Sequence, residues 1–221
     1  MTGLSASPDL AAPAVITVPR DVPDLASLLL VLAGLFAAPP EEGAIAALRE
    51  GAGADLLDRL AGDAGLAAPI AAFRARLAGE SDAAALARRL GPVFGRLYLG
   101  LGGPETVGLY ESVHRCGGRL FQAPVGEMDR LLAAHDLSVG FDREPADHLS
   151  IETALLAHLV ANRHPDRLAV VERLRGWVPA FRDGSLRCDE DGFFAAAADL
   201  LAAAIERAAE PSALQEQSRK A

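Results

Sequence analysis

Acids and imidazoles gather ahead of an apolar run in the segment DREPADHLSIETALLAHL, which extends from Asp142 to Leu159. On a helix, His148 and Glu152 are separated by one turn and therefore lie on the same face. Such a pair could transfer protons as an acid and a base, bind a metal ion, or form the charged edge of a groove that binds a peptide. The surrounding residues decide among these three kinds of site.

A metal site is not supported by the spacing of potential ligands. His158 follows His148 by ten residues, which places it roughly 100° away around a helix of about 3.6 residues per turn. A zinc site needs a third and a fourth ligand at recognisable spacing, and Cys116 and Cys188 form no CxxC pair. We therefore expect no bound metal and no cofactor.

A catalytic site is also incomplete. Ser112 and His114 are two residues apart on an expected helix, so their side chains point away from each other. The sequence has no GxSxG segment and no oxyanion-type loop. A helical enzyme that uses His148 and Glu152 as acid and base is the alternative, but it would lack a nucleophile and a cofactor loop. We expect a protein that is not an enzyme.

The segment YLGLGGPETVG, from Tyr98 to Gly108, contains four glycines and a proline and predicts a loop. A phosphate-binding P-loop requires GK[ST], whereas the only lysine in the chain is Lys220. A dinucleotide fingerprint requires a preceding strand, and the residues before Gly100 are expected to be helical. The loop is therefore interpreted as the end of a helix followed by a turn.

The elements that must position the polar residues are helices. Proline is favoured at the first helical position, so Glu144 and Pro145 predict a helix start with Asp147 in the first turn, near the positive end of the helix dipole. Apolar side chains then recur at helical spacing in Leu149, Leu155, Leu156 and Leu159. Charged groups beside an apolar stripe favour a peptide-binding groove.

Composition predicts a folded, all-α protein. The 221 residues are 51% hydrophobic, and β-branched residues seldom alternate with polar ones as a half-buried strand requires. A net charge of −9 gives no reason to expect a nucleic-acid partner, and two distant cysteines indicate no disulfide framework and fit a reducing cytoplasm. We predict a bundle of about ten helices, at 24–37, 41–50, 53–62, 66–78, 82–98, 105–116, 124–135, 145–162, 165–176 and 190–209.

The expected organisation has two helical parts. We predict a loose tail at 1–20, an N-terminal helical domain at 21–140 and a smaller C-terminal one at 141–221, with a hinge at about 138–145 and a second tail from about 211. The apolar run before Pro39 and Pro40 is expected to be a buried first helix. The residues before it lack the net positive charge of an export signal, and the run is too short to span a bilayer.

Four segments in order resemble the redox-enzyme maturation chaperones, the family that includes the dedicated chaperones of trimethylamine N-oxide reductase and dimethyl sulfoxide reductase. They are FGRLYLGLGGP (94–104), LYESVHRCGGRLF (109–121), EPADHLSIE (144–152), and LRGWVPAFRDG (174–184) followed by GFFAAAADLL. Gly108 stands where the family usually has proline, and the glycine loop lacks the fuller Gly-Pro-Gly form.

The resemblance implies an all-helical cytoplasmic chaperone that is not an enzyme. It would bind the twin-arginine signal peptide and the apo-form of a molybdopterin oxidoreductase, and hold this client until its cofactor is inserted. The resemblance also implies a monomer or a domain-swapped homodimer without stable membrane insertion. A generic helical adaptor is a further alternative. The motifs assign the client-binding role to Phe94, Leu97, Tyr98, Tyr110, Ser112, Val113, Glu144, Pro145, Asp147, His148 and Glu152.

Overall fold

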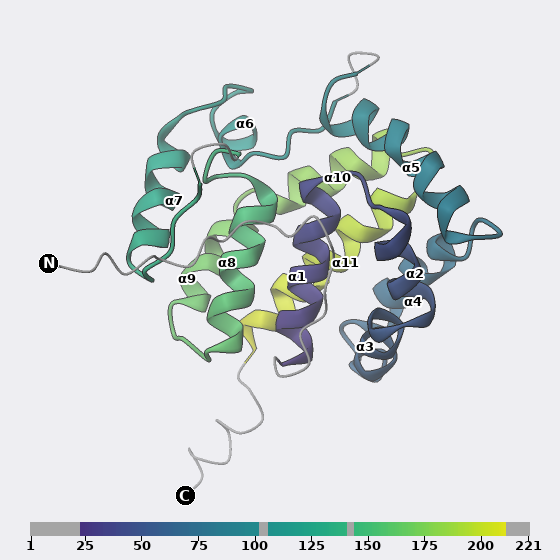
Figure 1. Cartoon of the computed structure of the whole chain (residues 1–221). Coiled ribbons are helices and arrows are strands. Elements are labelled where there is room, and N and C mark those ends of the chain that lie inside the picture. Colours follow the sequence, from purple (N-terminus) through teal and green to yellow (C-terminus); the bar gives the residue numbers. More distant parts are fainter. Residues whose placement is uncertain (1–22, 102–105, 141–143, 211–221) are drawn as a thin grey trace, which may run out of the picture.

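The computed structural model describes residues 23–101, 106–140 and 144–210. Within these ranges the chain forms eleven α-helices and no strand, which confirms the predicted all-α class (Figure 1). The helices are α1 (Asp24–Ala37), α2 (Glu42–Glu50), α3 (Ala52–Leu60), α4 (Ala67–Leu77), α5 (Ala83–Tyr98), α6 (Glu111–Arg115), α7 (Ala123–Ala133), α8 (Leu149–Ala161), α9 (Arg167–Arg175), α10 (Val178–Cys188) and α11 (Phe193–Ala209).

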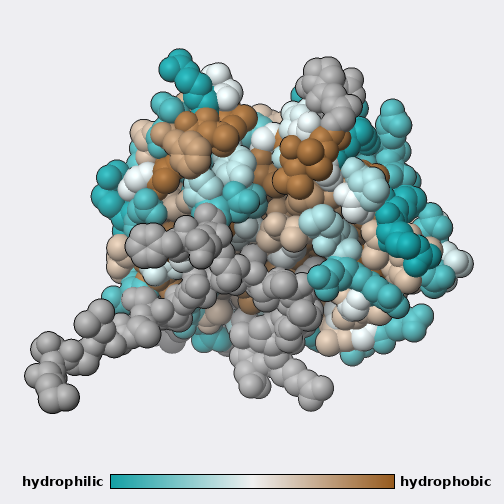
Figure 2. All heavy atoms as spheres, turned by 45° about the horizontal axis from the view of Figure 1, so that its top comes forward, coloured by the Kyte–Doolittle hydropathy of each residue, from teal (hydrophilic) through white to brown (hydrophobic). Residues whose placement is uncertain are grey.

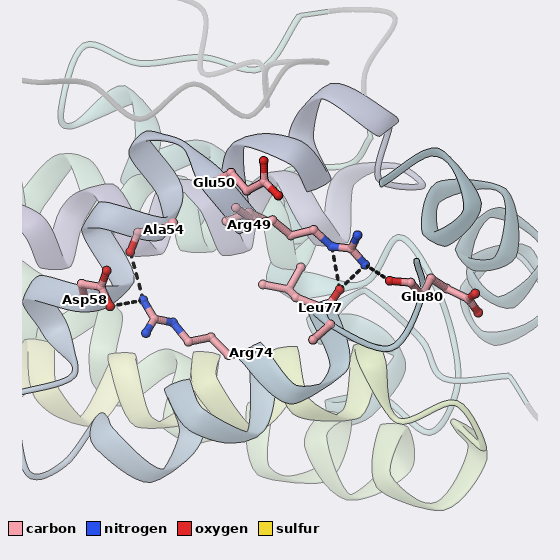
Figure 3. A pocket seen from close by; sticks show the side chains of 9 residues that line it. Arg49, Glu50, Ala54, Asp58, Arg74, Leu77 and Glu80 are labelled. Atoms are coloured by element: carbon pink, nitrogen blue, oxygen red, sulfur yellow. Dashed lines mark hydrogen bonds and ion pairs between the residues drawn. The ribbon is translucent and has the colours of Figure 1, made fainter. Parts of the chain in front are cut away.

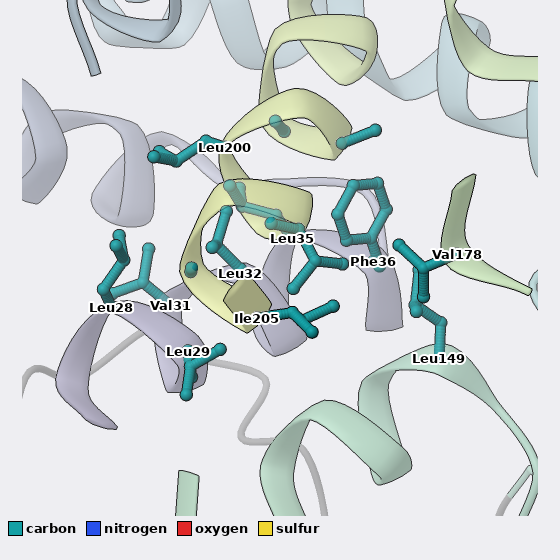
Figure 4. Close-up of a cluster of buried hydrophobic side chains, with 14 of the residues drawn as sticks. Leu28, Leu29, Val31, Leu32, Leu35, Phe36, Leu149, Val178, Leu200 and Ile205 are labelled. Carbon is teal, nitrogen blue, oxygen red and sulfur yellow. The ribbon is translucent and has the colours of Figure 1, made fainter. Parts of the chain in front are cut away.

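The first helix lies in the middle of the structure. α1 packs mainly against α8 and also against α11, so apolar side chains on most of its circumference are buried. Figure 4 shows Leu32, Leu35 and Phe36 of α1 in one cluster with residues of the later helices, among them Leu149, Val178, Leu200 and Ile205. The expectation of a buried helix at 24–37 is confirmed.

Two helices begin later than the sequence predicted. The expected helix at 105–116 is reduced to α6, because Val107 donates its backbone N–H to the Leu97 carbonyl at 2.7 Å and Leu109 accepts from Leu149 at 2.7 Å. These long-range bonds require an extended chain. Gly108 fits there because a Cβ at this position would lie 2.7 Å from Cγ1 of Val113.

The helix predicted at 145–162 begins only at Leu149. His148 is the N-cap, and its backbone N–H donates to the Pro145 carbonyl at 3.0 Å, so the residues before Leu149 form a turn. The predictions that Pro145 starts the helix and that Asp147 lies in its first turn are wrong. The turn is favoured because it allows His148 to form an isolated antiparallel bridge with Tyr110.

Helix α10 was not predicted. The segment PAFRDGS suggests a turn. However, Pro179 lies in the first helical turn, where proline is tolerated, and the helix continues through Gly184. A Cβ at Gly184 would lie 3.0 Å from Cγ1 of Val107, so this glycine allows the close approach of α10 to the segment before α6. Proline at the helix start was the signal that could have indicated α10.

The division into two domains stays a prediction. One cluster of buried apolar residues includes α1, α5, α8 and α11 and thus residues from both sides of the expected boundary. The tails and residues 141–143 of the expected hinge lie outside the described residues. None of the helices in the described ranges has the length and apolar character needed to cross a membrane. Cys116 and Cys188 are both free thiols.

Candidate functional site

The segments that contain the predicted polar residues meet at one place, which we call the α6–α8 junction and define as residues 108–115 and 144–152. The backbone N–H of Glu111 donates to the Asp147 carbonyl at 3.0 Å, and that of Leu149 donates to the Leu109 carbonyl at 2.7 Å. This short antiparallel pairing holds the N-terminus of α6 beside the N-terminus of α8. Two of the four sequence motifs are thereby brought together.

Asp147 caps α6, the helix across the junction. Its side chain is buried, and Oδ2 accepts the backbone N–H of Ser112 at 2.9 Å. A carboxylate at a helix N-terminus satisfies an otherwise unpaired N–H and interacts favourably with the helix dipole. The sequence predicted that Asp147 would face the dipole of its own helix, whereas the structure shows that it caps α6. The buried Ser112 hydroxyl has no hydrogen-bond partner among the described residues.

His148 is a buried, neutral imidazole. Its Nδ1 lies 2.7 Å from the Ser150 hydroxyl and accepts the Ser150 backbone N–H at 3.2 Å, which places the ring proton on Nε2. Burial lowers the pKa of His148 to about 4, although Glu144 and Asp147 raise it in part. A histidine in this state is uncharged near neutral pH and serves as an N-cap.

Tyr110 and Glu144 form the outer edge of the junction. The Tyr110 ring packs edge-to-face on the His148 ring, with centroids 5.0 Å apart, and its hydroxyl donates to Oε2 of the exposed Glu144 at 2.6 Å. Burial and the Glu144 carboxylate raise the pKa of Tyr110, so the phenol stays protonated. Pro145 is half-buried next to this pair. The edge therefore offers an aromatic ring and a negative charge to solvent.

Below the junction lies a buried ion network centred on Arg173 of α9. Arg173 pairs with Glu111, donates to Glu127 at 3.0 Å and has its Nε 3.8 Å from Oε2 of Glu152. The same Glu152 oxygen accepts from Nε1 of Trp177 at 3.3 Å. Burial, followed by the neighbouring Glu111, raises the pKa of Glu152 well above its usual range.

The buried network does not resemble a catalytic pair. His148 contacts Ser150 and Tyr110, whereas Glu152 contacts Arg173 and Trp177, so the two predicted acid–base residues have different partners. Both are fully or almost fully buried. Arg173 was missed by the sequence reasoning, and the signal was weak because an arginine on an amphipathic helix is usually exposed.

The predicted apolar wall is part of the protein core. Leu97 is completely buried, Phe94 packs edge-to-face on Tyr98, and Tyr98 also contacts Phe36 and Phe194. A ligand could reach these side chains only if α5 moved away from α11 and α10. Val113 is half-buried and packs against Gly108. The role of these residues in binding stays a prediction.

Exposed apolar side chains occur in the motifs FGRLYLGLGGP and LYESVHRCGGRLF. They lie immediately after α5 and immediately before α7. Leu99 is 56% exposed, Leu101 68%, Leu120 41% and Phe121 72%. Figure 2 shows two apolar areas on the face formed by the top of Figure 1. Phe121 also has a positive φ of 57°, a conformation that is uncommon for a bulky residue. Apolar residues inside glycine-rich, non-helical segments were the signal that could have indicated this exposed apolar surface.

A separate pocket lies between α2, α3 and α4. It has a volume of about 500 Å³, and its lining includes two arginines that already have partners (Figure 3). Arg49 donates to the carbonyls of Leu77 and Glu80, and Arg74 donates to the Ala54 carbonyl and pairs with Asp58. No residue predicted for the site lines this pocket. Its arginines tie the helices together.

Comparison with known proteins gives concordant matches. The model of a family described as nitrate reductase delta subunit matches residues 60–183, a range that includes both sides of the α6–α8 junction. Chaperone protein TorD of Vibrio cholerae is 35% identical over 112 residues, covering 44% of this chain and 51% of that protein. Chaperone protein TorD of Salmonella agona is 34% identical over 94 residues, covering 38% and 45%. The chain spans about half the length of the curated relatives it matches. They are named chaperones, in agreement with the expectation of a protein that is not an enzyme.

Proposed function

The chain belongs to the nitrate reductase delta subunit family and is similar to chaperones named TorD, and on this premise we propose that it is a maturation chaperone for a redox enzyme. Its ligand would be an extended segment of the client protein. The proposal requires a surface that binds apolar side chains and tolerates different sequences, and no catalytic group.

The observation that carries the proposal is the exposure of Leu99, Leu101, Leu120 and Phe121. When a partner covers large apolar side chains that were exposed to water, binding is stabilised by roughly 25 cal/mol per Å² of buried apolar area. These residues belong to two of the four motifs that resemble the chaperone family, FGRLYLGLGGP and LYESVHRCGGRLF. We assign the apolar part of the client segment to this face.

Charge supports a basic, apolar peptide as the ligand. The protein has a net charge of −9, and exposed Glu144 lies at the edge of the junction beside Tyr110. Arginines form strong, directional hydrogen bonds with carboxylates, and a negative surface attracts a basic segment before contact. A twin-arginine signal peptide combines paired arginines with an apolar run, as the resemblance implies.

The sequence of events follows from this ligand. The chaperone would bind the signal peptide and the apo-form of a molybdopterin oxidoreductase in the cytoplasm, and release it for export after cofactor insertion. In the structure, Tyr110 and Glu144 form the edge that faces solvent, and the buried His148 ring supports it by packing against Tyr110. Phe94, Leu97 and Tyr98 would contribute only if α5 opened, whereas Asp147 and Glu152 hold the edge in place from below.

Titration calorimetry with a synthetic twin-arginine signal peptide tests the proposed ligand class. We expect micromolar binding, equivalent to roughly 8 kcal/mol. A matched peptide whose apolar run is replaced by serines should bind at least about tenfold more weakly, because the apolar contacts are lost. Equal binding of the two peptides, or no binding of the first, would contradict the proposal.

A further inference from the structure

Three of the five histidines come together where α7, α8 and α9 meet, at the left of Figure 1. The His135 and His164 rings pack edge-to-face with centroids 4.8 Å apart. Burial lowers the pKa of His158, and both rings lie near enough to lower it further. His135 follows the end of α7, His164 follows the end of α8, and Asp166 is the N-cap of α9. The positions are therefore set by two helix ends and one helix start.

The chain reverses direction at both histidines in a defined way. Asp136 and Arg163 have positive φ angles of 58° and 52°, and the backbone N–H of His164 donates to the Leu159 carbonyl at 2.8 Å. Such turns end helices with a fixed geometry, in which the last carbonyl groups find partners. The two imidazoles are thus presented by rigid turns, which is the kind of support that a binding site needs.

The geometry of the three potential ligand atoms matches a metal site. Nε2 of His135 is 3.4 Å and Nδ1 of His164 is 3.8 Å from Oδ2 of Asp166, and all three ligand atoms lie within 4.8 Å of one another. Zinc ligands at about 2.0–2.1 Å from a tetrahedral ion lie roughly 3.4 Å from each other. Two of the three separations are close to this value, and the third, between the two imidazole nitrogens, is at most 4.8 Å.

A second observation points to a ligand at this place. The His135 side chain is only 9% exposed, and its Nε2 has no hydrogen-bond partner among the described residues. A buried polar nitrogen without a partner costs roughly 1–3 kcal/mol, so most such atoms in folded proteins are satisfied. This nitrogen lies 3.4 Å from the Asp166 carboxylate but forms no hydrogen bond with it.

We propose that His135, His164 and Asp166 bind a divalent transition-metal ion of the zinc class through Nε2, Nδ1 and Oδ2. Two neutral imidazoles and one carboxylate are a ligand set that suits zinc. His164 and Asp166 are 42% and 51% exposed, so the remaining coordination position is open to water. The ion would tie the end of α7 to the connection between α8 and α9.

Binding has two requirements within the cluster. The backbone N–H of Asp166 donates to Nδ1 of His164 at 3.2 Å, and this bond must open to free the nitrogen for the ion. The histidines must also be neutral. The sequence spacing does not indicate this ligand set, because His135 is on a different helix connection from the other two residues.

Competition of the full-length protein with a chromophoric zinc indicator, after removal of any histidine tag, tests the proposal. We expect one zinc ion per chain, with the affinity reduced at least about tenfold in His164→Gln and in Asp166→Asn. Asp129→Asn, an exposed position on α7, removes the same charge and should bind zinc as the parent does. Zinc should also raise the thermal midpoint of the parent and of Asp129→Asn, but not that of His164→Gln.

The outcomes separate cleanly because His164 is partly exposed and its substitution leaves the core intact. Loss of zinc binding in a His164→Gln protein that keeps the parent's circular dichroism spectrum would support the site. Zinc binding by His164→Gln that is as tight as in the parent would overturn the proposal, as would a parent that binds no zinc. Client binding enters none of these measurements, so the result is independent of the proposed chaperone function.

Discussion

At His148, burial has a greater effect on the charge of the imidazole than the nearby carboxylates. The pKa is lowered to about 4, whereas the unfolded chain has the usual value of about 6.5. Between these two pH values the unfolded state binds more protons than the folded state, so folding stability falls as the pH falls. Above pH 6.5 the contribution of this residue is fully present.

The first prediction compares the parent with His148→Asn, since asparagine can also cap α8. From pH 6.5 to pH 4 the parent should lose on the order of 2 kcal/mol more free energy of unfolding than the variant. Glu152 acts in the opposite direction, because its raised pKa adds stability at low pH, but it does so in both proteins. Denaturant unfolding at several pH values measures the difference. Parallel pH profiles would show that His148 is not responsible.

Asp147 gives the second prediction. Asp147→Ala removes the acceptor of the Ser112 N–H and should lower the free energy of unfolding by about 1–2 kcal/mol. Asp82→Ala is the matched control, because Asp82 caps α5 at an exposed position by accepting from Ala85 at 2.6 Å. If Asp82→Ala destabilises the protein and Asp147→Ala does not, the assigned capping role is wrong.

The polar residues of the junction could be predicted from the sequence, but their partners could not. The motif EPADH predicted a helix start at Pro145, with Asp147 in the first turn near the positive end of the helix dipole. The structure shows that Asp147 caps α6, which precedes it by 35 residues along the chain. Periodicity and capping rules describe neighbours within one helix, so they give no information on a cap supplied from another segment.

At the scale of elements, Arg173 links four helices through one guanidinium. It contacts Glu111 of α6, Glu127 and the Pro124 carbonyl of α7, and Glu152 of α8. Glu111 and Glu152 are fully buried, so the removal of Arg173 leaves buried acidic groups without compensation. The short helices α6 and α7 have few other contacts that fix them against α9.

The third prediction is therefore that Arg173→Met lowers the free energy of unfolding by about 3–5 kcal/mol. Arg175→Met is the control on the same helix, since Arg175 pairs with Glu172 and Glu206 at the surface and its loss should have a much smaller effect. Chemical denaturation measures both variants. Equal effects would mean that the buried network contributes no more than a surface pair.

Helices with a regular apolar period were predicted well, and helices defined by tertiary contacts were not. The bounds of α1 at Asp24–Ala37 agree with the prediction because prolines follow a continuous apolar run. α10 was missed because Gly184 and its polar neighbours look like a turn, although this glycine makes room for Val107. Close approach of two distant segments cannot be read from local propensity.

For the whole molecule, the central position of α1 determines what the ligand can reach. α1 fills the space between α8 and α11, and the aromatic residues of α5 close the core beside it. The groove wall that the motifs predicted is thus occupied by the protein's own side chains. The apolar surface left for a client is the exposed set that follows α5 and precedes α7, which the helical pattern did not indicate.

The most direct test of the chaperone account is calorimetric titration of the twin-arginine signal peptide into Phe121→Asn. Asparagine tolerates the positive φ of this position, and Phe121 is 72% exposed, so the variant should fold as the parent does. Leu168→Asn, at an exposed apolar position on α9, is the control. The account predicts at least about tenfold weaker binding by Phe121→Asn, or roughly 1.4 kcal/mol, and unchanged binding by Leu168→Asn. Parent-like affinity of Phe121→Asn would contradict it.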